Sequence, residues 1–205
     1  MLWSAFMPEL MTFAHGCPIP VAESKARQAA IEFFRRTRAW VEWLDPVTSI
    51  ASASAEYDME PPSGADVIRI EQATIGGNQV PVASFRDVAQ DWERQALSEL
   101  QLVSRDLKTF RMGGTAAAGL LIQVQAALIP SRTSTGIPDD LFEKYVDDIA
   151  HGARAKILSI PGTTFYNPDI FRLEQSAFES SIATKSVDAW RGLTKNTPRP
   201  RVNFC

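Results

Sequence analysis

The chain has 205 residues, of which 45% are hydrophobic and 22% are charged, as in ordinary globular proteins. This length favours one domain that buries a core without disulfides or metals. The formal charge of -3 argues against a protein that wraps nucleic acid through a general positive excess, although DNA could still slide past such a surface.

The cysteines and the first fifteen residues give no sign of export or membrane insertion. Cys17 and Cys205 lie near opposite ends, which predicts neither a disulfide framework nor a metal site and makes a reducing compartment the default. The start lacks a basic region and is too short to span a bilayer. Its apolar residues recur at helical spacing: Trp3, Phe6, Met7, Leu10 and Ala14. We therefore expect a short amphipathic helix that packs on the core or on a neighbour.

A first long helix is predicted over about residues 20–38, after a stiff proline-rich entry at Cys17–Pro20. One face is rich in alanine, which permits close helix approach: Ala22, Ala26, Ala29, Ala30 and Phe33. The opposite side carries four arginines: Arg27, Arg35, Arg36 and Arg38. The simplest interpretation of this side is a solvated face. The alternative is a rim that contacts phosphates or a partner protein.

Residues 39–130 change to short strands, which predicts an antiparallel sheet inserted after the first helix. The expected strands cover Trp40–Leu44, Ala55–Met59 and Ala65–Ile75, the last with Ile68 and Ile70 on one face. The glycines of Gly76–Asn78 allow the positive φ angles of a tight turn, so we expect a hairpin whose second strand covers Gln79–Val82.

The second half of the insertion is less regular. We expect a short helix over Phe85–Ala96, two short strands around Arg105-Asp106, and a loose connector that starts at Gly113. The alternation within Leu120–Ile129 predicts a strand with one buried face.

Two further helices are predicted over about residues 139–158 and 167–191, joined by a turn at Pro161-Gly162. Asp140 and Glu143 have the spacing of a reciprocal cap, and Asn167-Pro168 has the residues of a helix start. The apolar stripes comprise Phe142, Val146, Ile149, Ala153 and Ile157 in the first helix, and Phe171, Phe178 and Ile182, with Glu174 and Lys185, in the second.

The order of these elements predicts an α+β fold, a small helical bundle with an inserted antiparallel sheet, as one domain over residues 1–190. From Arg191 onwards the chain has four basic residues, two prolines and no acid. We expect residues 191–205 to be extended until a partner binds them.

No catalytic, metal-binding or cofactor-binding motif can be built from the sequence, so we do not expect an enzyme. Asp147 and His151 are one helical turn apart, and a small hydrolase that uses this pair is a minor alternative. Gly152 beside them weakens its helix by up to about 1 kcal/mol relative to alanine. It therefore predicts close contact with another backbone.

Several separated segments, in this order and spacing, resemble the head–tail adaptor (connector, head-completion) proteins of tailed bacteriophages over residues 17 to 185. The segments are Cys17-Pro18, Ala29–Thr37 running into Trp40, Leu44–Pro46, Ala55–Tyr57, Pro130–Thr133, Ile137–Asp139, His151–Ala155, Pro161-Gly162 and Tyr166–Pro168.

The resemblance implies a structural protein of the virion neck, made in the host cytoplasm and not bound to a membrane. It would form a ring, typically of twelve copies, beneath the portal protein, offer a platform to tail or nozzle proteins, and let genomic DNA pass without sequence specificity. The tail would order against the portal through Arg191, Lys195, Arg199, Arg201 and Phe204. The alternative is a DNA-binding packaging or regulatory accessory that uses Arg27, Arg35, Arg36 and Arg38.

Overall fold

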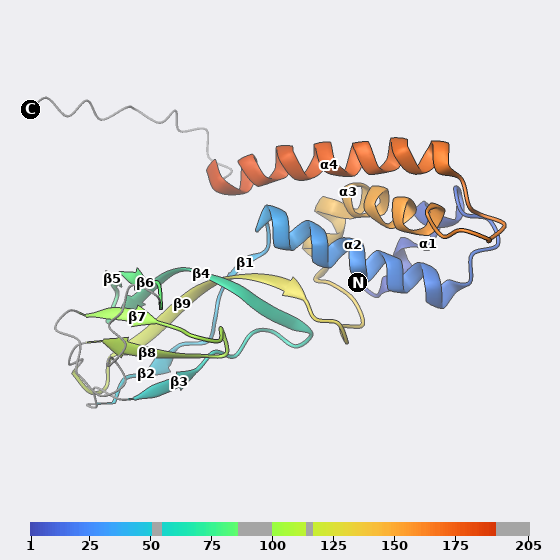
Figure 1. Ribbon diagram of the computed structural model, residues 1–205. Coiled ribbons are helices and arrows are strands. Elements are labelled where there is room, and N and C mark those ends of the chain that lie inside the picture. Colours follow the sequence, from blue (N-terminus) through green and yellow to red (C-terminus); the bar gives the residue numbers. More distant parts are fainter. Residues whose placement is uncertain (51–54, 86–99, 114–116, 192–205) are drawn as a thin grey trace, which may run out of the picture.

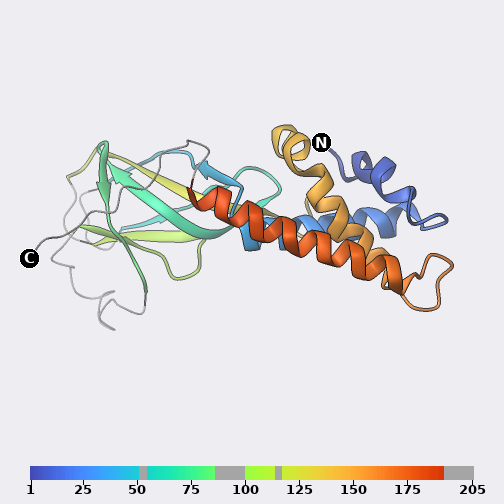
Figure 2. The ribbon, with the colours of Figure 1, turned by 90° about the horizontal axis from the view of Figure 1, so that it is seen from above.

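Two lobes lie end to end in the computed structural model of the chain, a helical bundle and a pair of packed β-sheets (Figures 1 and 2). The structure describes residues 1–50, 55–85, 100–113 and 117–191. The sheets are inserted between the first and the second long helix. The predicted α+β fold is confirmed.

The long helices of the described residues form the bundle: α2 (Ile19–Thr37), α3 (Asp139–Leu158) and α4 (Pro168–Arg191). The alanine face of α2 is buried as predicted, which brings α2 close to its neighbours. At the centre, the ring of Phe33 lies 5.2 Å from that of Tyr145 in α3 and 6.4 Å from that of Phe178 in α4. One aromatic residue therefore contacts both other helices of the bundle.

The N-terminal segment packs on this bundle, as expected. It forms a 3-10 helix, η1 (Trp3–Phe6), and the short helix α1 (Met7–Met11). Trp3, Phe6, Leu10 and Ala14 are all buried, and the Phe6 ring contacts that of Phe142 in α3 edge to face at 4.9 Å. The indole of Trp3 donates a hydrogen bond to the carbonyl of Ser134, 2.8 Å away.

The helix starts follow the prediction at α2, which begins after the extended Pro18, and at α4. The side chain of Asn167 accepts hydrogen bonds from the backbone N–H groups of Asp169 and Ile170, at 3.2 Å each. The reciprocal cap predicted for α3 is wrong, because α3 starts after Pro138 with no side-chain cap. The Asp139 carboxylate contacts the amino group of Met1 instead.

Gly152 permits a close approach, but to a side chain and not to a backbone. A Cβ atom at this position would lie 2.6 Å from the Phe178 ring, which is 1% exposed. The predicted contact with another backbone is therefore wrong, and the space that the glycine leaves is taken by the Phe178 ring.

In the part of the chain that the structure describes, nine strands form two sheets. The first sheet has the order β1 (Val41–Trp43), β9 (Leu121–Pro130), β4 (Ala65–Ile75) and β5 (Asn78–Val80), with β2 (Val47–Thr48) also paired to β9. The second has the order β3 (Glu56–Asp58), β8 (Thr109–Gly113), β7 (Gln101–Val103) and β6 (Val82–Ala83). The Tyr57 and Phe110 rings of neighbouring strands stack at 5.3 Å in the core.

This lobe differs from the single antiparallel sheet that we predicted. The hairpin at Gly76 and Gly77 is confirmed, with positive φ at both and Ile75 opposite Asn78. The returning strand ends at Val80, however, because Pro81 has no N–H group with which to extend the ladder. Val82 then pairs in parallel with β7 of the second sheet.

Other expectations change in detail. Register shifts between Val67 and Arg69 and between Ile70 and Gln72 interrupt the alternation predicted for β4, so that Ile70 is buried and Ile68 only half-buried. Gly113 belongs to β8 rather than to a connector. The helix predicted over Phe85–Ala96 lies, apart from Phe85, outside the described residues.

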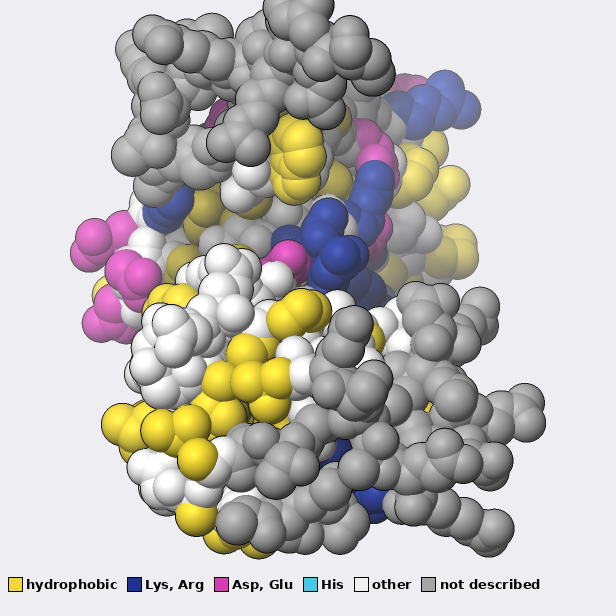
Figure 3. Space-filling model, turned by 90° about the vertical axis from the view of Figure 1, so that its left-hand side faces the viewer, with side chains coloured by type: hydrophobic (Ala, Val, Ile, Leu, Met, Phe, Trp, Pro, Cys, Tyr) yellow, Lys and Arg dark blue, Asp and Glu magenta, His cyan; other side chains and the backbone are white. Residues whose placement is uncertain are grey.

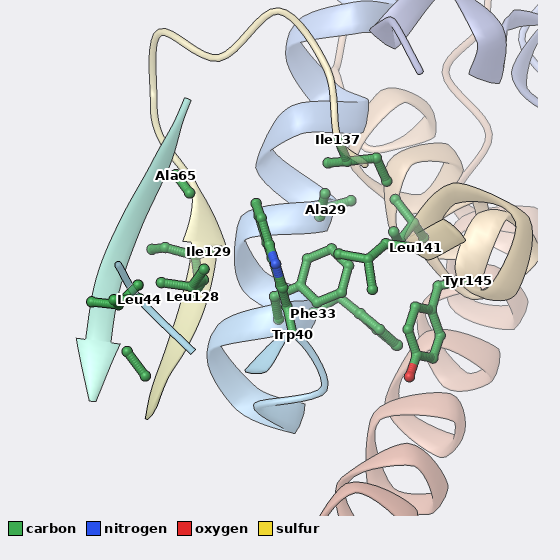
Figure 4. Packing of buried hydrophobic residues seen from close by; sticks show 14 of the residues in the cluster. Ala29, Phe33, Trp40, Leu44, Ala65, Leu128, Ile129, Ile137, Leu141 and Tyr145 are labelled. Atoms are coloured by element: carbon green, nitrogen blue, oxygen red, sulfur yellow. The ribbon is translucent and has the colours of Figure 1, made fainter. Parts of the chain in front are cut away.

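Trp40 joins the two lobes. Its ring, 3% exposed, contacts Phe34 of α2 at 5.7 Å, and its carbonyl accepts a hydrogen bond from the Leu128 N–H in β9 at 2.8 Å. Figure 4 shows Trp40 between the sheet residues and Tyr145 of α3. The core is therefore continuous from the bundle into the sheets.

Candidate interaction surfaces

The end of α4 reaches past the bundle and lies over the sheet lobe (Figures 1 and 2). Between them is a groove of about 330 Å³. We call it the α4 groove; it is lined by Arg36, Thr37, Arg38, Val41, Glu71, Gln125, Ser186, Ala189 and Trp190. Helix and sheet contribute both apolar and charged groups to it, which is the composition of a protein-binding surface.

Trp190 is the most exposed large apolar side chain of the described residues, at 83%. Val187 on α4, and Val41 and Trp43 on β1, are also exposed. A tryptophan left in water on the surface of a folded lobe is a common anchor of protein interfaces. Trp190 gives no signal in the sequence, because it follows the apolar stripe of α4 without belonging to it.

Two arginines of the predicted rim hold the structure together at the α4 groove. Arg36 donates two hydrogen bonds to the Glu179 carboxylate, at 2.9 and 2.6 Å, and thereby ties α2 to α4. These bonds lower the pKa of Glu179 below its ordinary value. Arg38 contacts Glu71 of β4 at 3.4 Å. Figure 3 shows basic side chains gathered on this face, with acidic side chains among them.

The other two arginines, Arg27 and Arg35, line a separate cleft of about 680 Å³ beside α2. A third, Arg132, comes from the loop after β9. We call this the arginine cleft; its lining is Ser24, Arg27, Gln28, Ile31, Arg35, Asp66, Ile129, Pro130, Ser131, Arg132 and Thr133. Arg27, Ile31 and Arg35 are spaced by four residues, which places them on one side of the helix.

The arginine cleft has an excess of positive charge. Arg27 donates a hydrogen bond to the carbonyl of Ser134 at 3.2 Å, and so has no carboxylate partner there. Within the described part of the chain, Arg35 and Arg132 form no ion pair, and Asp66 is the single acidic residue in the lining. Arg132 was missed in the sequence because a loop arginine gives no periodic signal.

The Asp147–His151 pair that we considered as a minor alternative does not form. The His151 side chain is turned to α4, where its Nδ1 lies 2.7 Å from Oε2 of Glu174. The same oxygen accepts a hydrogen bond from Nε of Arg154 at 2.8 Å. Asp147 remains exposed on another side of α3.

This cluster anchors the N-terminal segment. The Arg154 side chain is buried, its guanidinium lies 4.5 Å from the Phe13 ring centre, and it donates to the Glu9 carbonyl at 3.3 Å. Glu174 is also buried, so the charges of the pair compensate each other away from water. We interpret the cluster as a structural link among α1, α3 and α4.

Most of the predicted tail residues lie beyond the described part of the chain. Arg191 is the last residue of α4, and the other predicted tail residues, Lys195, Arg199, Arg201 and Phe204, lie outside the described residues.

Cys17 is a buried free thiol whose pKa is raised by burial. Among the described residues, no group of three or more His, Cys, Asp or Glu side chains could hold a metal ion. None of the described helices is both long and apolar enough to cross a membrane.

No protein-family model matches the chain, and no curated protein matches it.

Proposed function

We propose that this protein is a head–tail adaptor of a tailed bacteriophage. In this role it assembles as a ring, typically of twelve copies in the family that it resembles, beneath the portal protein at the neck of the virion. It offers the tail or nozzle proteins a platform and leaves a channel for the genome. It is made in the host cytoplasm and acts by assembly, without catalysis.

The observation that carries the proposal is the exposed Trp190 at the end of α4, beside the α4 groove. The helix leads directly from this groove into the basic segment 192–205. A polar, basic segment that starts at an apolar anchor is suited to ordering along a second protein, since the anchor supplies affinity and the segment supplies contact length. We assign the portal protein as that partner.

The ion pairs around the groove support the same role. Arg36 ties the middle of α4 to α2 through Glu179, and Arg38 at the end of α2 contacts Glu71 of the sheet lobe, so that α2 is held to both elements beside the groove. A rigid platform loses less entropy on binding than a flexible one. The overall charge of -3 is consistent with a channel along which DNA phosphates slide without being retained.

The test measures affinity for the isolated portal protein with the full-length chain, W190A, and a variant that lacks residues 193–205. Because an anchoring tryptophan contributes about 2 kcal/mol or more, W190A should bind about thirty-fold more weakly. The deletion should weaken binding further. The matched control is L173A, which removes a 71% exposed apolar side chain from the other end of α4 and should leave affinity unchanged. Unchanged portal binding by both W190A and the deletion would contradict the proposal.

The alternative function is a DNA-binding packaging or regulatory accessory. One observation favours it, the absence of ion-pair partners at Arg35 and Arg132 among the described residues. Against it, Arg36 and Arg38 already contact carboxylates. DNA affinity that falls steeply with salt, and falls again in R35A, would favour the accessory; a weak and flat salt response would favour the adaptor.

A further inference from the structure

Two oppositely charged surfaces lie on different helices of the bundle. The first is the arginine cleft, whose lining carries Arg27, Arg35 and Arg132 against the single acid Asp66. Ile31 lies between the two helix arginines and gives the cleft an apolar floor. An occupant therefore needs negative charge and some apolar contact.

The second surface is the first half of α3. We call it the acidic face, and define it by Asp140, Glu143 and Asp147, all exposed. Their spacing of three and four residues places them on one side of the helix. The exposed Lys144 lies among them with its ammonium 5.1 Å from the Tyr145 ring centre, so the face keeps a net negative charge. Within the described part of the chain, none of the three forms an ion pair. The neighbouring Asp139 differs, because it contacts the amino group of Met1.

The two surfaces face away from each other within one copy. Tyr145 of α3 points to α2, where its ring lies 5.2 Å from Phe33, and Asp147 follows two residues later. Two residues are about 200° around a helix, so Asp147 faces away from α2. Ile31 likewise precedes Phe33 by two residues and faces away from α3. The arginine cleft and the acidic face of one copy therefore cannot contact each other.

The two surfaces also match in length. At about 1.5 Å per residue, Asp140 and Asp147 are about 10 Å apart along α3, and Arg27 and Arg35 are about 12 Å apart along α2. From this complementarity we infer that the arginine cleft of one copy receives the acidic face of α3 of the next copy. The inference rests on the proposed ring, and it names the residues at the contact between neighbours.

A contact between two different surfaces of the same chain is head-to-tail. Such a contact leaves one free cleft and one free acidic face on every pair, and each further copy repeats it until the ring closes. Because the charged groups are exposed, the contact should weaken as salt rises. Part of the affinity should remain at high salt, because the apolar floor of the cleft also contributes to the contact.

The test uses charge reversal on each surface and on both. R35E/R132E reverses the cleft and keeps Arg27, which bonds to Ser134. E143K/D147K reverses the acidic face and keeps Asp140 in the first turn of α3. A third variant combines all four substitutions. The control, E60K/R172E, reverses one exposed acid and one exposed base outside both surfaces.

Ring formation is measured by mass photometry across protein concentrations, with thermal unfolding to show that every variant is folded. Each two-substitution variant should need at least about ten-fold more protein to form rings, because like charges then meet at every contact. The combined variant should form rings at a protein concentration within about three-fold of that of the unmodified protein, because each contact again joins opposite charges with their sides exchanged. The control should match the unmodified protein.

The outcomes separate this contact from the function on which it rests. If the unmodified protein and all variants form the same ring, the contact is wrong and the adaptor function stands. If either reversal stops assembly and the combined variant does not recover, the two surfaces do not meet each other. If the unmodified protein forms no ring, alone or with the portal protein, both the proposed function and this contact are overturned.

Discussion

The close contact between Gly152 and the Phe178 ring sets the distance between α3 and α4. A methyl group added at position 152 should therefore lower the free energy of unfolding by an amount that can be estimated. In G152A, the new Cβ atom would lie 2.6 Å from the buried Phe178 ring. Such overpacking costs about 1–3 kcal/mol, and the better helix propensity of alanine offsets about 1 kcal/mol of it. Because 2.6 Å is shorter than real Cβ contacts and the ring is buried, we place the overpacking at about 2–3 kcal/mol and expect a net loss of about 1–2 kcal/mol in the free energy of unfolding.

A double-mutant cycle isolates this contact. F178L removes the far edge of the ring and should cost about 1 kcal/mol by itself. In G152A/F178L the alanine methyl group occupies space that the ring has left, so the double variant should be more stable than the sum of the single effects by about 1 kcal/mol. L173A on the exposed side of α4 is the control and should change stability by less than about 0.5 kcal/mol.

The assay is urea denaturation followed by circular dichroism at one protein concentration. Strictly additive losses, or a G152A variant as stable as the unmodified protein, would refute the reasoning. In that case the two helices would not be in contact at this point.

Three further predictions concern the charged groups and the end of α4. E174A leaves the buried Arg154 without its carboxylate and should cost about 3 kcal/mol or more, with faster hydrogen exchange in α1; R154M/E174A should recover part of the loss. E179Q should cost at most about 1 kcal/mol, because the Arg36–Glu179 pair is exposed. Since this pair lowers the pKa of Glu179, the difference from the unmodified protein should be present above the ordinary glutamate pKa and vanish as pH falls through the lowered one; a difference that persists in acid would contradict the pairing. W190A should change the melting temperature of the isolated protein little, because its side chain is 83% exposed; a large drop would show that the indole packs within the fold.

The helical frame could be predicted from the sequence because its signals are local. The alanine face of α2 and the Asn167-Pro168 start of α4 depend on residues within one or two turns of each other, and both are confirmed. The parallel pairing of Val82 with Leu102 could not be predicted, because it depends on where Pro81 ends the hairpin and on a strand twenty residues away.

The candidate surfaces were less predictable for the same reason. Arg36 looks like a solvated residue of α2, but its partner Glu179 is 143 positions further along the chain. The four arginines grouped by the helix pattern therefore separate into two pairs, one that stabilises the fold and one that lines a cleft with Arg132. Their position on one side of a helix predicts that all four side chains are exposed. Which of them form ion pairs depends on how the later helices and loops pack beside α2.

We propose that this chain works as a ring at the portal. The most direct measurement is the native mass of the purified protein, alone and mixed with portal protein. We expect a closed ring of about twelve copies that forms alone or on the portal. A single copy that stays monomeric at every concentration, and does not associate with the portal, would contradict it.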